Sequence, residues 1–275
     1  MDEIRSLKEI SRAVSGVLGE RFPRGGGGDL VTSPDLDHPI KEIDLVAEEA
    51  AIQRVGVIRP EWNIEAEDSG FIDKGGGETL VVDPIDGTFN AIHGIPLYST
   101  SLALRLKDPP TITHSFIENL ATGDSYEAVK GGGAFHNGCE MTTEKGDAFK
   151  ERGLQISLYL GRSGLGPLSR VLPYLKRGRA LGCISLEVCL VASGVLDAVL
   201  FYGRVPRVCD ISAARLVLEE AGGGFVQVSG GEKVYLESRP LVEKEHMTTI
   251  AGANRLVNEY IIERVFPDIK QEEGS

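Results

Sequence analysis

Two aspartates, three residues apart, follow a short apolar run of the chain. The run is Thr79–Val82; Asp83 and Asp86 come after it, and Gly87 and Thr88 follow at once. Carboxylates are ligands that hard divalent cations prefer. A glycine turn has free backbone N–H groups that can face an anion, especially where a helix begins. The stretch therefore predicts a place where a metal ion and a phosphate meet, although the same residues also form ordinary polar turns.

The segments around these aspartates indicate strands. Thr79–Val82 is short, apolar and rich in β-branched residues, which favours a buried strand. Pro84 cannot donate to a sheet ladder, so the strand should stop about there, with Asp83 at its carboxyl end. Upstream, Trp62–Ala66 predicts another strand that feeds Glu67. On residue type alone a surface turn explains Glu67 as well.

Two further acidic residues stand where helical patterns begin. Asp44 precedes a segment rich in Ala, Glu and Leu, which favours a helix to about Val57. Asp210 precedes apolar positions at helical spacing, and Gly222 can end that helix. A simple N-terminal cap explains either aspartate as readily as a functional role.

Three motifs together resemble the inositol monophosphatase family, whose members are magnesium-dependent phosphomonoesterases. Asp83–Thr88 looks like the family signature DP(I/L)DGT, a specific match of six residues. Glu67–Gly70 resembles the acidic pair upstream of it, and Cys209–Gly223 resembles the second signature, (W)DxAAGxLxxxEAGG. This chain has Cys209 where Trp is frequent and Arg215 where Gly is frequent, which affects substrate geometry more than metal binding.

The resemblance implies a magnesium site and assigns roles to its residues. The implied metal ligands are Glu67, Asp83, the carbonyl of Ile85, Asp86 and Asp210. Four carboxylates carry four negative charges, so two Mg²⁺ ions balance them and a third makes the site positive. The implied water-activating pair is Glu67 and Thr88, and the implied phosphate and substrate contacts are Gly87, Thr88, Asp86 and Asp210.

A loop adds carboxylates whose place is open. Residues 29–39 are rich in Asp, Ser and Pro and form either a linker or a lid that orders on metal binding. Asp37 and Asp44 could complete a third metal site as further catalytic residues, and Asp35 competes with Asp37 for that place.

The basic residues of the second half bear on the substrate. Arg179–Ser185, which includes Ile184, and the pair Arg204 and Arg207 resemble archaeal-type enzymes that act on inositol phosphate and fructose 1,6-bisphosphate. Arginine binds phosphate in a bidentate way, so Arg179 or Arg204 could hold a second phosphate. Ordinary surface arginines remain the alternative. The other functions considered are a 3′-phosphoadenosine or NADP phosphatase of the same superfamily and a non-catalytic sugar-phosphate-binding protein.

The order of elements predicts an α/β (α+β) protein. The expected helices and strands are a helix over about 2–20, three strands at 99–106, 111–118 and 124–130, a helix at 167–176, a short strand at 180–181, and a last strand and helix at 248–265. We divide the chain into a metal-binding half, 1–145, and an α/β half, 146–275, that completes the active site. The resemblance implies a layered αβαβα sandwich, usually a homodimer.

Composition limits the function classes. The chain has 275 residues, 41% of them hydrophobic, and 41 acidic against 29 basic residues give a net charge of −12. This charge argues against nonspecific nucleic-acid binding, and it is compatible with phosphate chemistry only if metals reverse the local sign. No apolar run approaches the roughly 20 residues that span a bilayer. With no signal-peptide pattern at the N-terminus, we expect a cytoplasmic protein whose four cysteines are core thiols.

Overall fold

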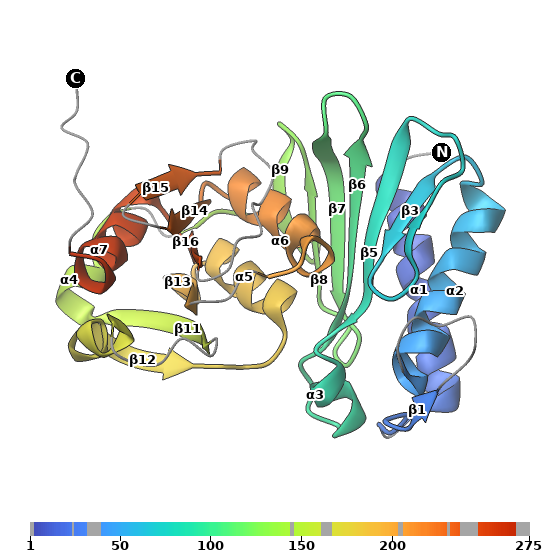
Figure 1. The fold of residues 1–275 in the computed structure, drawn as a ribbon, viewed down its shortest axis with the longest axis horizontal. Helices are drawn as coiled ribbons and strands as arrows, with labels where there is room; N and C mark the ends of the chain where they lie inside the picture. The colour runs from blue at the N-terminus through green and yellow to red at the C-terminus, as the bar shows by residue number, and fades with distance from the viewer. Residues whose placement is uncertain are drawn as a thin grey trace. The chain divides into compact units, whose positions relative to one another are not determined.

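The computed structural model divides the chain into two compact units (Figure 1). It describes residues 3–23, 25–31, 40–143, 146–160, 167–202, 206–229, 232–236 and 247–267. The first unit holds Met1–Glu140 together with Gly182–Leu186 and Val208–Val217, and the second holds the remaining segments. Two short pieces from late in the chain therefore fold with the N-terminal segment. Each unit joins a sheet to helices, which confirms the predicted α/β class.

Two long helices cover one face of the sheet in the first unit (Figure 1). They are α1 (Glu3–Arg21) and α2 (Glu42–Ile58), close to the predicted ranges. The apolar stripe of α1, at three- and four-residue spacing, is buried together with one face of α2 against the sheet. The buried side chains of this core include Leu7, Ile10, Val14, Ala47, Trp62, Leu80, Leu102 and Leu104. The two helices thus pack on one face of the sheet.

The first unit contains an eight-stranded sheet in the order β10-β9-β8-β7-β6-β5-β3-β4. Its strands are β3 (Asn63–Ala66), β4 (Gly70–Ile72), β5 (Glu78–Asp86), β6 (Ser99–Leu106), β7 (Thr111–Asn119), β8 (Ser125–Val129), β9 (Gly133–His136) and β10 (Cys139–Met141). A two-stranded sheet pairs β1 (Leu30–Val31) with β2 (Ile40–Lys41), and α3 (Thr88–Ile92) follows β5. The predicted meander of antiparallel strands is confirmed, while β3 and β5 pair in parallel.

The second unit is built around a six-stranded sheet in the order β12-β11-β13-β16-β14-β15. Its elements are α4 (Phe149–Arg152), β11 (Leu154–Leu160), two 3₁₀ turns η1 (Pro167–Arg170) and η2 (Leu172–Tyr174), β12 (Leu175–Arg179), β13 (Ala198–Tyr202), β14 (Gly224–Ser229), β15 (Glu232–Tyr235), β16 (Thr248–Gly252) and α7 (Arg255–Val265). Helices α5 (Ile184–Ala192) and α6 (Val208–Glu220) begin in the first unit and end in the second. The predicted last strand and helix are confirmed.

Strand β5 does not stop at Pro84, contrary to the sequence-based expectation. It runs to Asp86, and its register with β6 shifts between Asp83 and Asp86. Its pairing with β3 ends at Val82, so beyond that point β5 has a ladder partner on one side only. A proline at such a bulge needs no N–H donor, and its carbonyl accepts a hydrogen bond from Thr100 Oγ1 at 3.0 Å.

The segment expected as a helix at 167–176 is also different. It forms two separate 3₁₀ turns and then enters β12, which ends at Arg179, so the expected strand at 180–181 is absent as well. Pro173 lies inside η2, where its ring opposes a continuous α-helix. Among the cysteines, Cys183 and Cys189 are buried as expected, whereas Cys139 is exposed and is not a core thiol.

Within the part of the chain that the structure describes, no helix is both long and apolar enough to cross a bilayer.

The last helix offers a test of local stability. Asn254 caps α7: its side chain accepts a hydrogen bond from Val257 N at 3.0 Å and donates to the Gly146 carbonyl at 3.0 Å. We expect Asn254→Ala to lower the free energy of unfolding by about 1 kcal/mol, because a helix N–H loses its partner. Asn254→Asp keeps the accepting oxygen and should retain most of the stability. Urea denaturation followed by circular dichroism measures both; equal midpoints for Asn254→Ala and wild type would contradict the role of the cap.

Candidate active site

Parallel pairing of β3 and β5 brings two predicted metal ligands side by side. Ala66 pairs with Val82, so the next residues, Glu67 just beyond β3 and Asp83 within β5, lie on neighbouring segments at the same end of the two strands. Asp83 is 1% exposed, and its Oδ1 accepts a hydrogen bond from Ile85 N at 3.1 Å. These two acidic residues, sixteen positions apart in sequence, are placed by sheet register.

The pKa of Asp83 shows that several carboxylates lie close together here. Burial raises the pKa of Asp83 well above its usual range, and the charges of Glu67, Asp86 and Asp210 raise it further. All four are predicted metal ligands, and their mutual repulsion places them within electrostatic reach of one another. Among the described residues, neither Asp83 nor Asp86 forms an ion pair with a basic side chain. A bound cation would offset the repulsion among these carboxylates.

Asp86 is held by the beginning of α5. Its carboxylate accepts hydrogen bonds from Ile184 N at 3.1 Å, Ser185 N at 2.5 Å and the Cys183 thiol at 3.3 Å. Burial raises the pKa of Asp86, while the bonds from Ser185 and Cys183 oppose that rise. The first N–H groups of a helix stabilise a negative charge. Helix α5 therefore both orients Asp86 and stabilises the ionised form of its carboxylate.

The turn after Asp86 requires glycine. Gly87 has a left-handed backbone with φ of 89°, and a Cβ atom there would lie 3.0 Å from the Gly182 carbonyl oxygen and 3.2 Å from Cys183 Cβ. Thr88 then begins α3. The turn therefore packs closely against the residues that lead into α5, and its N–H groups follow directly on Asp86.

Thr88 and Asp44 form a hydrogen-bonded pair between α3 and α2. Thr88 Oγ1 donates to Asp44 Oδ1 at 2.9 Å and lies 3.1 Å from the Ile85 carbonyl oxygen. Burial raises the pKa of Asp44 from 3.8 to about 7, with smaller rises from Glu67 and Asp68; the Thr88 hydrogen bond opposes the change. Asp44 is inside the first turn of α2, and Lys41 is the cap residue, so the capping interpretation of Asp44 is wrong.

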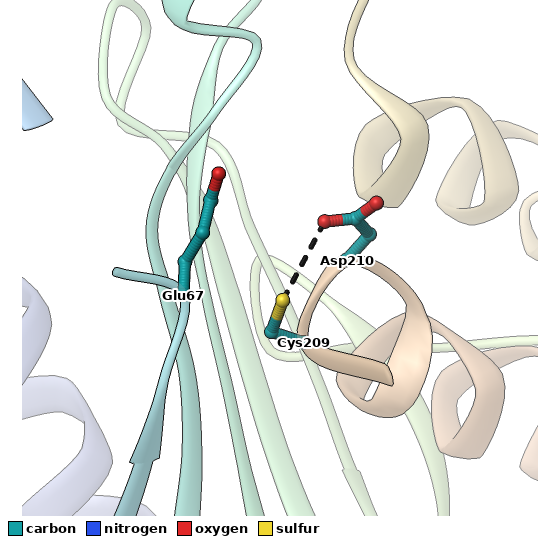
Figure 2. Close-up of side chains that lie close together, drawn as sticks. All are labelled: Glu67, Cys209 and Asp210. Carbon is teal, nitrogen blue, oxygen red and sulfur yellow. Dashed lines mark hydrogen bonds between the residues drawn. The ribbon is translucent and has the colours of Figure 1, made fainter. Parts of the chain in front are cut away.

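Asp210 lies in the first turn of α6, beside a thiol (Figure 2). The helix begins at Val208, so Asp210 is not its cap. Ligand atoms of Glu67, Cys209 and Asp210 all lie within 4.8 Å of one another, and the Cys209 thiol donates to Asp210 Oδ1 at 3.6 Å. Residues more than 140 positions apart therefore offer three donor atoms to one point.

Glu48 is a residue of the site that sequence reasoning missed. It is 3% exposed, and its carboxylate accepts hydrogen bonds from Asp68 N at 3.0 Å, from Ser69 N at 2.9 Å and from the Ser69 hydroxyl. These bonds fix the turn that directly follows Glu67. A signal was available: Glu48 is four residues after Asp44, and such residues share one face of a helix.

For several predicted residues the described structure does not test a place in this group. Asp37, the competing Asp35 and Arg204 lie outside the described residues. Arg179 is half-buried on β12 in the second unit, and Arg207, which precedes α6, is exposed. Ile184 uses its backbone N–H to bind Asp86. The substrate contacts expected of these residues remain predictions.

Comparison with known proteins shows the family to which this chain belongs. The model of the inositol monophosphatase family matches residues 1–261. The chain belongs to that family. This family member is 32% identical over 281 residues to a fructose-1,6-bisphosphatase/inositol-1-monophosphatase of Methanothermobacter thermautotrophicus, covering 94% of each protein. It is also 32% identical over 222 residues to a bifunctional NADP phosphatase/NAD kinase of Methanococcus maripaludis, a match that covers 72% of this chain and 38% of that protein.

A solved structure confirms the fold of this family member. A crystal structure of an inositol monophosphatase–fructose 1,6-bisphosphatase matches with a TM-score of 0.77 and 25% identity, covering 97% of this chain and 100% of the other. The predicted family and fold are therefore confirmed. The relatives are named as phosphatases, the enzyme class that the sequence predicted.

The donor set of the site fits magnesium. Its candidate donors are hard carboxylate oxygens and the Ile85 carbonyl oxygen, which accepts a hydrogen bond from Thr88 Oγ1, and Mg²⁺ prefers such donors. The crowding of carboxylates around Asp83, which itself has no basic ion-pair partner among the described residues, is the observation that favours a cation.

The hydrogen bonds to Glu48 predict a specific effect on the turn after Glu67. In Glu48→Gln an amide N–H₂ replaces one carboxylate oxygen, so a donor faces the N–H of Asp68 or Ser69. We expect the amides of Asp68 and Ser69 to exchange with solvent about tenfold faster or more, since a bond to a charged acceptor contributes about 1.5–3 kcal/mol. Hydrogen exchange followed by NMR measures this. Glu49→Gln is the matched control, because Glu49 is exposed on the same helix and the charge change is identical.

Asp44 predicts a pH-dependent stability. Between pH 3.8 and about 7 the folded carboxyl keeps a proton that the unfolded chain has lost, so stability falls as the pH rises through this window and is level above it. Asn cannot ionise. The free energy of unfolding of Asp44→Asn relative to wild type should therefore rise across the window, measured by urea denaturation with a chelator present. A difference that is constant with pH would show that Asp44 titrates at its ordinary value.

Proposed function

We propose that this protein is a Mg²⁺-dependent phosphomonoesterase that hydrolyses fructose 1,6-bisphosphate, inositol 1-phosphate or both. The observation that carries the proposal is the group of carboxylates around Asp83, next to the turn formed by Gly87 and Thr88. A phosphomonoesterase needs positive charge for its substrate, donors for phosphate oxygens and a group that takes a proton from water. This arrangement offers a place for each of them.

The residues that would hold magnesium are those predicted from the sequence. They are Glu67, Asp83, Asp86, Asp210 and the carbonyl oxygen of Ile85. The charge of two Mg²⁺ ions matches the four carboxylates, and a third ion would make the site attractive to a phosphate dianion. Magnesium, when bound, supplies Lewis acidity toward phosphate oxygens and makes a nearby water easier to deprotonate.

The pair of Thr88 and Asp44 would receive the proton of the attacking water. Thr88 Oγ1 donates to Asp44 Oδ1 at 2.9 Å, so the hydroxyl can accept a proton from water while it passes its own to Asp44. The pKa of Asp44, raised by burial to about 7, suits a group that exchanges protons near neutral pH. Glu67 would help to orient the same water.

Phosphate would bind at the turn, and a second phosphate would bind an arginine. The N–H groups of Gly87 and Thr88 are our candidates for the phosphate oxygens. The Nη1 atom of Arg179 is buried without a hydrogen-bond partner in the described part of the chain, which favours an anionic ligand. Arg179 therefore remains our first candidate for recognition of a bisphosphate, together with Arg204.

A second candidate function is hydrolysis of the 2′-phosphate of NADP. It is favoured by the 32% identity to the NADP phosphatase/NAD kinase of Methanococcus maripaludis over 72% of this chain. The chemistry at the metal site would be the same, and only the contacts to the rest of the substrate would differ. A homodimer, a cytoplasmic location and the absence of a nucleic-acid partner stay predictions.

Phosphate release tests the proposal. We would incubate the protein with fructose 1,6-bisphosphate, inositol 1-phosphate and NADP in parallel, with magnesium and with a chelator. We expect release only with magnesium, and a loss of more than about a hundredfold in Asp83→Asn, since even outer partners of metal ligands change activity by 10–100-fold. The ratio between substrates decides between the two candidate functions.

Stability provides the control for the variant. Asp83→Asn removes repulsion from three neighbouring carboxylates, so it should unfold in the absence of metal at a temperature equal to or above that of wild type. Loss of activity in a stable variant therefore reports on metal binding. Absence of release from every substrate would overturn the proposal and favour a non-catalytic sugar-phosphate-binding protein.

A further inference from the structure

Glu187 is a buried acidic residue that the proposed reaction does not use. It lies on α5, in the part of that helix that belongs to the second unit, and none of its surface is exposed. Its Oε1 atom accepts a hydrogen bond from Leu181 N at 3.0 Å and another from the Tyr159 hydroxyl. Its Oε2 atom accepts one from the Ser157 hydroxyl. Three donors on two oxygens compensate the burial of this carboxylate and fix its orientation.

The donors to Glu187 lie around the end of β12. Ser157 pairs with Arg179 in the parallel ladder of β11 and β12, and Ser157 Oγ lies 3.3 Å from the Arg179 carbonyl oxygen. Leu181 comes two residues after Arg179, and its N–H donates directly to Glu187. The carboxylate therefore holds the segment Arg179–Leu181 at one end directly and at the other end through Ser157.

The side chain of Arg179 has donors to offer. Its Nη1 atom is buried and forms no hydrogen bond with the residues that the structure describes. The sequence from Arg152 to Leu186 contains no Asp or Glu, so no carboxylate of that stretch competes for the guanidinium. A guanidinium binds phosphate oxygens in a bidentate way, and a buried N–H without a partner gains free energy when an anion pairs with it.

We propose that Glu187 is a positioning residue that presents the Arg179 guanidinium to the second phosphate of a bisphosphate substrate. It acts through the backbone of Arg179–Leu181 and does not touch the substrate itself. A fixed backbone lowers the entropy cost of ordering a long side chain on its ligand, so the effect falls on recognition of the bisphosphate. The identity of the ligand rests on the proposed function, whereas the hydrogen bonds of Glu187 do not.

Two substitutions separate the hydrogen bonds of Glu187 from its volume. Glu187→Met keeps an unbranched side chain of similar length and has no oxygen. Glu187→Gln keeps one oxygen for Leu181 N and the Tyr159 hydroxyl, and its N–H₂ group can donate to Ser157, whose hydroxyl both donates and accepts. We would measure the ratio of kcat/KM for fructose 1,6-bisphosphate to kcat/KM for inositol 1-phosphate. We expect this ratio to fall about tenfold in Glu187→Met and to stay within about twofold of wild type in Glu187→Gln.

A control variant separates positioning from a general loss of stability. Asn254→Ala removes the cap of α7 in the same unit, so it should lower the midpoint of urea denaturation and leave the substrate ratio unchanged. Ser157→Ala replaces Glu187→Met if that variant does not fold, and it should lower the ratio as well. A ratio that falls as far in Glu187→Gln or in Asn254→Ala as in Glu187→Met overturns the positioning role.

Calorimetry provides a readout besides activity. Phosphate release with the same substrate ratio in wild type and Glu187→Met overturns the positioning role and leaves the phosphatase function standing. If no substrate releases phosphate, the dissociation constant of fructose 1,6-bisphosphate, titrated calorimetrically with Mg²⁺ present, takes the place of the ratio. A rise of about tenfold in Glu187→Met that Glu187→Gln reverses supports the positioning role and rejects the phosphatase function alone. Equal constants, or no binding to wild type, overturn the positioning role.

Discussion

The negative charge gathered where β3 and β5 end is the constraint on which the first unit depends. Asp83 and Asp86 are buried, and the charges of Glu67 and Asp210 act on Asp83 as well. Burial and like charge both oppose ionisation, so without a cation this edge destabilises the folded chain. Sheet register places Glu67 next to Asp83, and backbone N–H donors hold Asp83 and Asp86.

The elements around the edge share this positioning. Helix α5 directs its first N–H groups at Asp86, and α2 contributes two carboxylates one turn apart. One of them, Asp44, receives the Thr88 hydroxyl; the other, Glu48, holds the turn after Glu67. One face of α2 therefore orients both Thr88 and the turn that follows Glu67. This explains why α2 carries a buried acidic residue on a side that packs against the apolar core.

The sequence by itself determined the local elements and the chemistry of the central motif. Helix α1 and the antiparallel strands follow from the periodicity of apolar residues, and the chemistry expected of Asp83–Thr88 follows from residue type. Both signals depend only on residues close together in the chain. The tertiary structure alone decided that α5 binds Asp86, that Glu48 holds the turn at Asp68, and that Cys209 lies beside Glu67. It also decided that β5 continues past Pro84. Beyond Val82 the strand pairs with β6 alone, and at the bulge there no hydrogen bond from the nitrogen of Pro84 is needed. These outcomes depend on the pairing of segments far apart in the chain, which no local pattern records.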